Sequence, residues 1–154
     1  MIVREGKSVF KGVAIGKIFV YKKADNAVKK ETVADTAAEM ARFEAAKEKA
    51  LGQLKGLYEK ALKDVGEEEA MIFDVHQMLL DDPDYNDSIK DIIENEKMNA
   101  EYAVFMTSEQ FAAMFLSMDD DYMRGRAADI KDISERVISI LNGSQVSPEA
   151  MPEP

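Results

Sequence analysis

Apolar residues recur at steps of three and four along most of this chain, which is the spacing of one face of an α-helix. The first such stripe consists of Met40, Phe43, Ala46, Ala50, Leu54, Leu57, Ala61 and Val65. Thr32 and Asp35 resemble a capping box at its start, and Gly66 is expected to end it. The pattern predicts one helix of about nine turns, at 3.6 residues per turn.

Two shorter helices are predicted to follow. Glu67 opens a run of three glutamates, and negative charge favours the N-terminal end of a helix, so a second helix is expected from there to about Leu80. Asp82 and Pro83 are typical of the N-cap and first turn of a third helix, with Ile89, Ile92 and Ile93 inside.

The remaining pattern predicts a fourth helix capped by Asn99 and a fifth capped by Asp119 or Asp120. Their apolar positions are Tyr102, Met106, Phe111, Met114 and Phe115, then Tyr122, Met123, Ala127, Ile130, Ile133, Val137 and Ile140. Asn142 and Gly143 are a C-cap signal. We therefore expect a mainly α fold, a helical hairpin or bundle over residues 32–143.

The N-terminal segment "SVFKGVAIGKIFVYKK" (8–23) has a different pattern, rich in Val, Ile and Phe with two glycines. It predicts a strand or two, and a lone strand needs partners from elsewhere. The glycines and lysine of "GVAIGK" do not have the spacing of a phosphate loop, so a strand is the favoured interpretation. We expect three parts: a β segment at 1–25 from an incomplete sheet whose other strands are missing from this chain, the helical domain at 32–143, and a linker or tail at 144–154.

Composition narrows the function. The 154 residues include 30 acidic and 20 basic side chains, a formal charge of −10. This disfavours nucleic acid and anionic membranes, which need clustered Lys and Arg. It suits a basic protein partner, although solubility is the commoner reason for an acidic charge in a cytosolic protein. Cysteine is absent, no apolar run is long enough to span a membrane, and the N-terminus lacks a signal-peptide core. We expect a cytoplasmic protein without membrane insertion.

His76 is the single histidine, followed by the acidic run "DDPD" at 81–84. The acidic runs lack the pattern of a calcium loop, and caps are the favoured interpretation over a metal site. We expect His76 to lie on the bundle side of the second helix, away from converging polar groups. A hydrogen-bonded packing role is therefore preferred to catalysis, although a catalyst using His76 stays an alternative.

The second helix carries two apolar stripes on nearly opposite sides. Ile72, Phe73, His76 and Leu80 form the stripe expected to face the bundle, and Met71, Val75 and Met78 form the other, with Leu79 between. Either both stripes are core, or the second is an exposed patch with acids around it. The exposed patch would suit a basic docking partner.

Several segments resemble the N-terminal region of enzyme I of the bacterial sugar phosphotransferase system, a phosphoenolpyruvate–protein phosphotransferase. They are "GVAIGK", "EEEAMIFDVHQMLLDDP", "MNAEYAV" and "LSMDDDYMRGRAADIKDISERVISILNG", and they cover about residues 8 to 143. The run from Arg126 to Ile133 is the most specific. The resemblance implies the first strand of an α/β phosphohistidine domain, followed by an inserted helical domain that binds the phosphocarrier HPr.

In that family, phosphate passes from phosphoenolpyruvate to an enzyme histidine and then to HPr, with magnesium. The histidine motif is expected beyond the end of this chain, and His76 is not its counterpart. The resemblance therefore implies a fragment that is inactive alone and has no catalytic residue, metal site or cofactor of its own. Its partners would be HPr and the rest of enzyme I, with dimerisation through the absent C-terminal half.

By matched position, the resemblance assigns phosphocarrier contacts to the second helix and its neighbours. The candidates are Glu67, Glu68, Met71, Val75, Met78, Leu79, Asp82, Asp84, Phe115, Met123 and Arg126. The alternative is a helical scaffold that dimerises through Met71, Val75 and Met78 and has no role in phosphotransfer.

Overall fold

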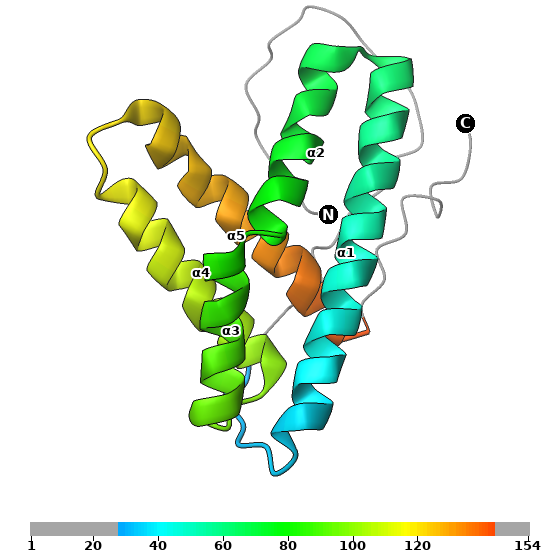
Figure 1. Cartoon of the computed structure of the whole chain (residues 1–154). Coiled ribbons are helices and arrows are strands. Elements are labelled where there is room, and N and C mark those ends of the chain that lie inside the picture. The colour runs from blue at the N-terminus through cyan, green and yellow to red at the C-terminus, as the bar shows by residue number, and fades with distance from the viewer. Residues whose placement is uncertain (1–27, 144–154) are drawn as a thin grey trace, which may run out of the picture.

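The computed structural model describes residues 28–143, which form five helices. They are α1 (Thr36–Asp64), α2 (Glu67–Leu80), α3 (Pro83–Asn95), α4 (Ala100–Leu116) and α5 (Asp121–Leu141) (Figure 1). The predicted mainly helical fold is confirmed. The strand expected within 8–23, the β segment at 1–25 and the tail at 144–154 lie outside the described residues, so the division into three parts stays a prediction.

The helices form two antiparallel hairpins (Figure 1). α1 packs along α2, and α4 packs along α5. α3 continues the path of α2 after a short break and packs mainly on α4. α5 crosses behind α2 and also contacts α1, while the tips of the two hairpins stand apart. α2 and α3 thus form one layer on the α4–α5 pair, with α2 against α5 and α3 against α4.

Three helix starts are fixed by aspartates that accept backbone N–H groups. Asp35 accepts from Ala38 at 3.0 Å, and Asp82 accepts from Tyr85 at 3.0 Å. Asp120, not Asp119, caps α5. The expected capping box at Thr32 is wrong, because Asp35 is itself the N-cap and Thr32 instead forms an isolated antiparallel bridge with Met98.

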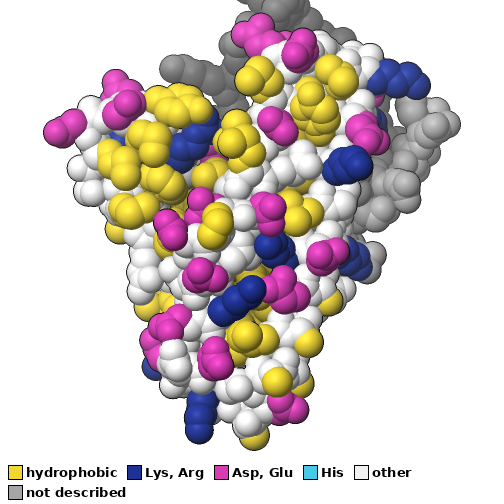
Figure 2. Space-filling view, viewed as in Figure 1, with side chains coloured by type: hydrophobic (Ala, Val, Ile, Leu, Met, Phe, Trp, Pro, Cys, Tyr) yellow, Lys and Arg dark blue, Asp and Glu magenta, His cyan; other side chains and the backbone are white. Residues whose placement is uncertain are grey.

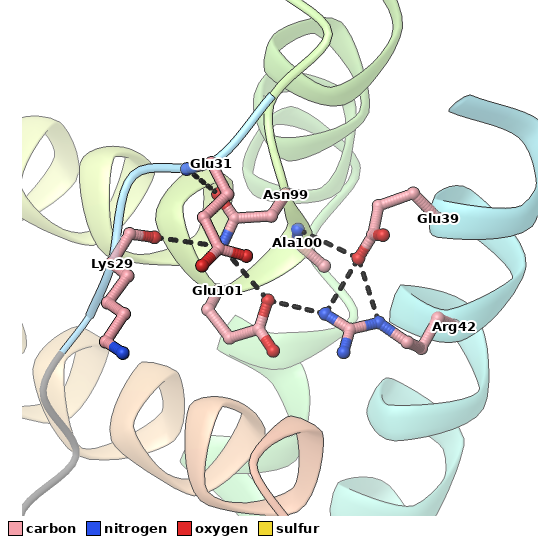
Figure 3. Close-up of polar contacts among 7 residues, drawn as sticks. All are labelled: Lys29, Glu31, Glu39, Arg42, Asn99, Ala100 and Glu101. Atoms are coloured by element: carbon pink, nitrogen blue, oxygen red, sulfur yellow. Dashed lines mark hydrogen bonds and ion pairs between the residues drawn. The ribbon is translucent and has the colours of Figure 1, made fainter. Parts of the chain in front are cut away.

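Asn99 stands at the N-cap position of α4, but its side chain does not cap the helix as expected. Its Oδ1 accepts from Glu31 N–H and its Nδ2 donates to the Lys29 carbonyl, both at 2.9 Å (Figure 3). Glu39 of α1 supplies the missing acceptor, because its Oε1 lies 3.1 Å from Ala100 N (Figure 3). We call Asn99 with the residues at 29–31 the clasp; it joins the start of α4 to the chain that leads into α1.

The core lies where the hairpins meet and is built from the expected stripes. Its largest fully buried apolar side chains are Tyr85, Phe43, Leu54, Leu80, Ile89, Ile93, Ile130 and Ile133. In the stripes of α1, α4 and α5, three positions are exposed instead: Val65 at 62%, Met114 at 44% and Tyr122 at 65%. Each lies at or near a hairpin tip, where no second helix covers it.

Candidate partner-binding surface

The outward face of α2 is apolar. Met71 is 55% exposed and Met78 is 68% exposed, while Val75 is half-buried beside them. Leu80, on the opposite side of the helix, and Ala70, about 100° around it from Met71, are fully buried. Of the two interpretations of the second stripe, the structure therefore supports an exposed patch and not a second core stripe.

Ile72 corrects one expectation. It was assigned to the stripe that faces the bundle, but 41% of it is exposed. At 100° per residue, Ile72 lies between the direction of Met71 and that of the half-buried Phe73, so it stands at the border of the packed side. Its position widens the exposed apolar face of α2.

Acidic side chains stand at both ends of this face. Glu67 and Glu68 are exposed in the first turn of α2, and Asp84 is exposed in the first turn of α3. Asp82 is half-buried because its carboxylate caps α3. Figure 2 shows acidic side chains between and around the hydrophobic groups on this side of the molecule.

The tip of the α4–α5 hairpin presents a second apolar group. Met114, Leu116 and Tyr122 are exposed there, and Figure 2 shows hydrophobic side chains gathered over this tip. Of the residues expected at this end of the site, Met123 is half-buried and Phe115 is 92% covered, since its exposed fraction is only 8%. Phe115 thus supports the surface from beneath, whereas the three exposed residues were not among the candidates.

A depression of about 170 Å³ lies between α2–α3 and the α4–α5 pair. Its lining consists of Leu79, Asp82, Asp84, Tyr85, Phe111, Met114, Phe115 and Ile130. The structure therefore brings together four of the candidate residues from three separate segments. The rings of Tyr85 and Phe111 meet edge-on with centroids 5.7 Å apart, which gives the depression a packed aromatic wall.

Met78 does not line this depression. It borders another depression of about 420 Å³, between α1 and α2, together with Leu51, Lys55 and Asp81. The candidate residues of α2 therefore spread over its whole outward side, from this α1 groove to the aromatic depression.

His76 is not isolated from polar groups, contrary to the expectation. Its Nε2 lies 3.2 Å from Oδ1 of Asp129, and Arg126 Nη1 donates to the other oxygen of that carboxylate at 2.8 Å. The Arg126 guanidinium also stacks on the Tyr122 ring, 4.2 Å from its centroid. The hydrogen-bonded packing role expected for His76 agrees with this geometry: the group ties α2 to α5 and holds Arg126 in place.

Two further findings on residues 28–143 concern metal binding and membrane insertion. In this part of the chain, no cluster of three or more His, Cys, Asp or Glu side chains is arranged to hold a metal ion. None of the helices described there is long and apolar enough to cross a membrane.

Comparisons of sequence and of structure with known proteins point to the same family. The family described as PEP-utilising enzyme, N-terminal, matches residues 5–126. A phosphoenolpyruvate-protein phosphotransferase of Geobacillus stearothermophilus is 44% identical over 142 residues, and that of Bacillus subtilis is 38% identical over 140 residues. These matches cover 92% and 91% of this chain, but the chain spans only 25% of the length of each relative.

Two solved structures share the fold. An NMR solution structure of an Enzyme I protein (nEIt) superimposes with a TM-score of 0.77 at 35% identity, covering 83% of this chain and 52% of that one. A structure of the N-terminal domain of Enzyme 1 - Nitrogen has a TM-score of 0.71 at 27% identity, covering 79% and 51%. The helical arrangement described above is thus the one found in these N-terminal domains.

Proposed function

This chain belongs to the N-terminal family of PEP-utilising enzymes, and from that premise we propose that it is the phosphocarrier-docking part of a phosphoenolpyruvate–protein phosphotransferase. The partner is an HPr-type carrier. In the whole enzyme, phosphate passes from phosphoenolpyruvate to an enzyme histidine in another part of the protein, with magnesium, and then to the carrier. The helical part holds the carrier while the second transfer occurs.

The observation that carries this proposal is the exposed apolar surface. It consists of Met71, Ile72, Val75 and Met78 on α2 with Met114, Leu116 and Tyr122 at the α4–α5 tip. We call these seven residues the docking surface. Exposed apolar groups with a charged rim are typical of a protein-binding site, because they supply affinity once a partner excludes water from them.

The charge of the rim suits a basic partner. Glu67, Glu68 and Asp84 are exposed around the docking surface, and the whole chain carries a formal charge of −10. Complementary charge speeds encounter and fixes orientation more than it adds affinity. Orientation matters for this function, because phosphoryl transfer needs donor and acceptor roughly in line.

Arg126 has a supporting part in this proposal. Asp129 holds its guanidinium on one side and the Tyr122 ring covers it on the other, so the side chain is fixed beside the docking surface. A fixed guanidinium loses little conformational entropy when it contacts a carrier carbonyl or carboxylate.

The test is a calorimetric titration of the chain with HPr of Bacillus subtilis. Met78→Asp places a charge within the docking surface, and we expect affinity to fall at least about tenfold, which corresponds to roughly 1.4 kcal/mol. Phe105→Asp is the matched control, because Phe105 is also exposed (40%) but lies on the opposite side of α4 from Met114. Equal affinities for Met78→Asp and the unsubstituted chain would refute the surface.

The alternative function is self-association through the same apolar residues, as in a dimeric scaffold. The acidic rim argues against it, because two copies would bring like charges together. Sedimentation velocity separates the two functions: a monomer that forms a one-to-one complex with HPr supports docking, and a dimer that excludes HPr supports the scaffold.

A further inference from the structure

The methionines of the chain are unevenly exposed. Among the eight at described positions, Met71, Met78 and Met114 are exposed, at 55%, 68% and 44%. The other five pack partly buried against the core: Met40, Met98, Met106, Met118 and Met123. All three exposed methionines belong to the docking surface, so three of its seven side chains are thioethers.

Thioethers differ from aliphatic side chains in one respect that matters here. A hydroperoxide converts them to sulfoxides, which are polar and accept hydrogen bonds. The chain contains no cysteine, whose thiolate would otherwise be the more reactive sulfur. Among the described residues, the most accessible sulfur atoms therefore lie on the docking surface.

We propose that Met71, Met78 and Met114 form an oxidisable site, and that their conversion to sulfoxides by a hydroperoxide releases the phosphocarrier. The proposal rests on the proposed docking function. Docking would then respond to oxidative conditions without any change in the fold.

The chemistry balances with hydrogen peroxide as the oxidant. A sulfur lone pair attacks one peroxide oxygen, an S–O bond forms as the O–O bond breaks, and the second oxygen leaves as water after proton transfer. Sulfur loses two electrons and the peroxide gains them. Methionine sulfoxide reductases, one for each sulfoxide epimer, reverse the change.

The effect on binding follows from desolvation. A sulfoxide oxygen is hydrated in the free protein and loses that water when an apolar partner covers it. Because none of the three side chains is a core residue, the fold does not have to accommodate the oxygen. We expect the dissociation constant for the carrier to rise about tenfold or more while helicity stays unchanged.

The first arm of the test locates the modification without reference to the carrier. The chain is exposed to graded hydrogen peroxide, and peptide mass spectrometry follows the gain of one oxygen atom at each described methionine. Met71, Met78 and Met114 should be oxidised before Met40 and Met106. Oxidation at equal rates, or first at the partly buried positions, would overturn the site.

The second arm measures binding of Bacillus subtilis HPr before and after peroxide, and again after treatment with both sulfoxide reductases. The variant Met71→Leu/Met78→Leu/Met114→Leu cannot be oxidised at these positions, so peroxide should not change its affinity for HPr, whatever that affinity is before treatment. The variant Met40→Leu/Met106→Leu is the control: peroxide should lower its affinity for HPr as much as it lowers that of the unsubstituted chain.

The outcomes separate the two proposals. If the untreated chain binds HPr and the oxidised chain binds equally well, the oxidation inference fails and docking stands. If the untreated chain does not bind HPr, docking fails and the inference fails with it. Loss of affinity that persists in the triple leucine variant would also overturn the inference, since it would arise elsewhere.

Discussion

Helices α2 and α3 are consecutive and nearly equal in length, with 14 and 13 residues, yet they use their apolar side chains in opposite ways. α3 buries Tyr85, Asn86, Ile89, Ile92 and Ile93. α2 buries only Ala70 and Leu80 to the same degree and leaves Met71, Ile72 and Met78 exposed.

The difference shows which side chains folding requires. The outward positions of α3 carry exposed acids such as Asp87, Asp91 and Glu94, as expected for a helix that serves only the core. A smaller part of the surface of α2 packs against the core. α2 therefore carries more apolar residues than its packing requires. Such an excess is what a helix with a partner to bind would show.

Two isoleucines offer the sharpest test of this contrast. Ile93 of α3 is fully buried and Ile72 of α2 is 41% exposed. Ile93→Ala removes core contacts and leaves a cavity, so the free energy of unfolding should fall by about 2–5 kcal/mol. Ile72→Ala should cost less than about 1 kcal/mol, because its atoms are partly in water already.

Urea denaturation of both variants measures these losses. Equal losses would show that α2 and α3 contribute to the core alike, and the contrast would be wrong.

A smaller loss of stability is expected at the clasp, where the contacts are hydrogen bonds and not apolar packing as in α3. Asn99→Ala removes the hydrogen bonds to Glu31 N–H and the Lys29 carbonyl at a buried position, so unfolding should become easier by about 1–3 kcal/mol. Asn95→Ala, an exposed asparagine at the end of α3, is the control and should change stability by less than about 0.5 kcal/mol. Thermal unfolding compares the two, and similar melting temperatures would exclude a structural role for the clasp.

The hydroxyl of Tyr85 makes the stability of the α3 core depend on pH. Ser134 donates its single hydroxyl hydrogen to the Ile130 carbonyl at 2.6 Å, so Tyr85 must be the donor in the 2.7 Å bond between the two hydroxyls. Burial raises the pKa of Tyr85 well above its usual value.

The sign of the effect follows from the raised pKa. Above about pH 10 the unfolded chain releases the Tyr85 proton and the folded chain keeps it, so stability falls by up to about 1.4 kcal/mol per pH unit from this group. Tyr85→Phe cannot release a proton, and its stability should fall less steeply between about pH 10 and about pH 11. At neutral pH it should lose only about 1 kcal/mol. Identical alkaline slopes in urea denaturation would contradict this assignment.

The helices themselves could be predicted well, because the periodicity and the caps are local properties. Asp82 with Pro83 placed the start of α3, and the glutamates from Glu67 placed the start of α2. The exposed character of Met71 and Met78 also followed, as one of two alternatives, from the angle between the stripes.

The contacts that escaped prediction join residues far apart in the sequence. Glu39 caps α4 from 61 positions away, and Asp129 meets His76 across 53. Periodicity carries no information about such pairs, because it describes one helix at a time. The exposure of Met114 and Tyr122 was missed for the same reason: they continue an apolar stripe into the α4–α5 tip, which stands apart from the α1–α2 hairpin (Figure 1).

The central claim is that the outward side of α2, with the α4–α5 tip, receives an HPr-type carrier. The most direct measurement is an NMR titration of the isotope-labelled chain with unlabelled HPr of Bacillus subtilis. Backbone amide shifts should concentrate at residues 67–84 and 114–126, with little change along the acidic outer face of α3 after residue 87. Shifts centred on α3 or the clasp, or no shifts at all, would contradict the claim.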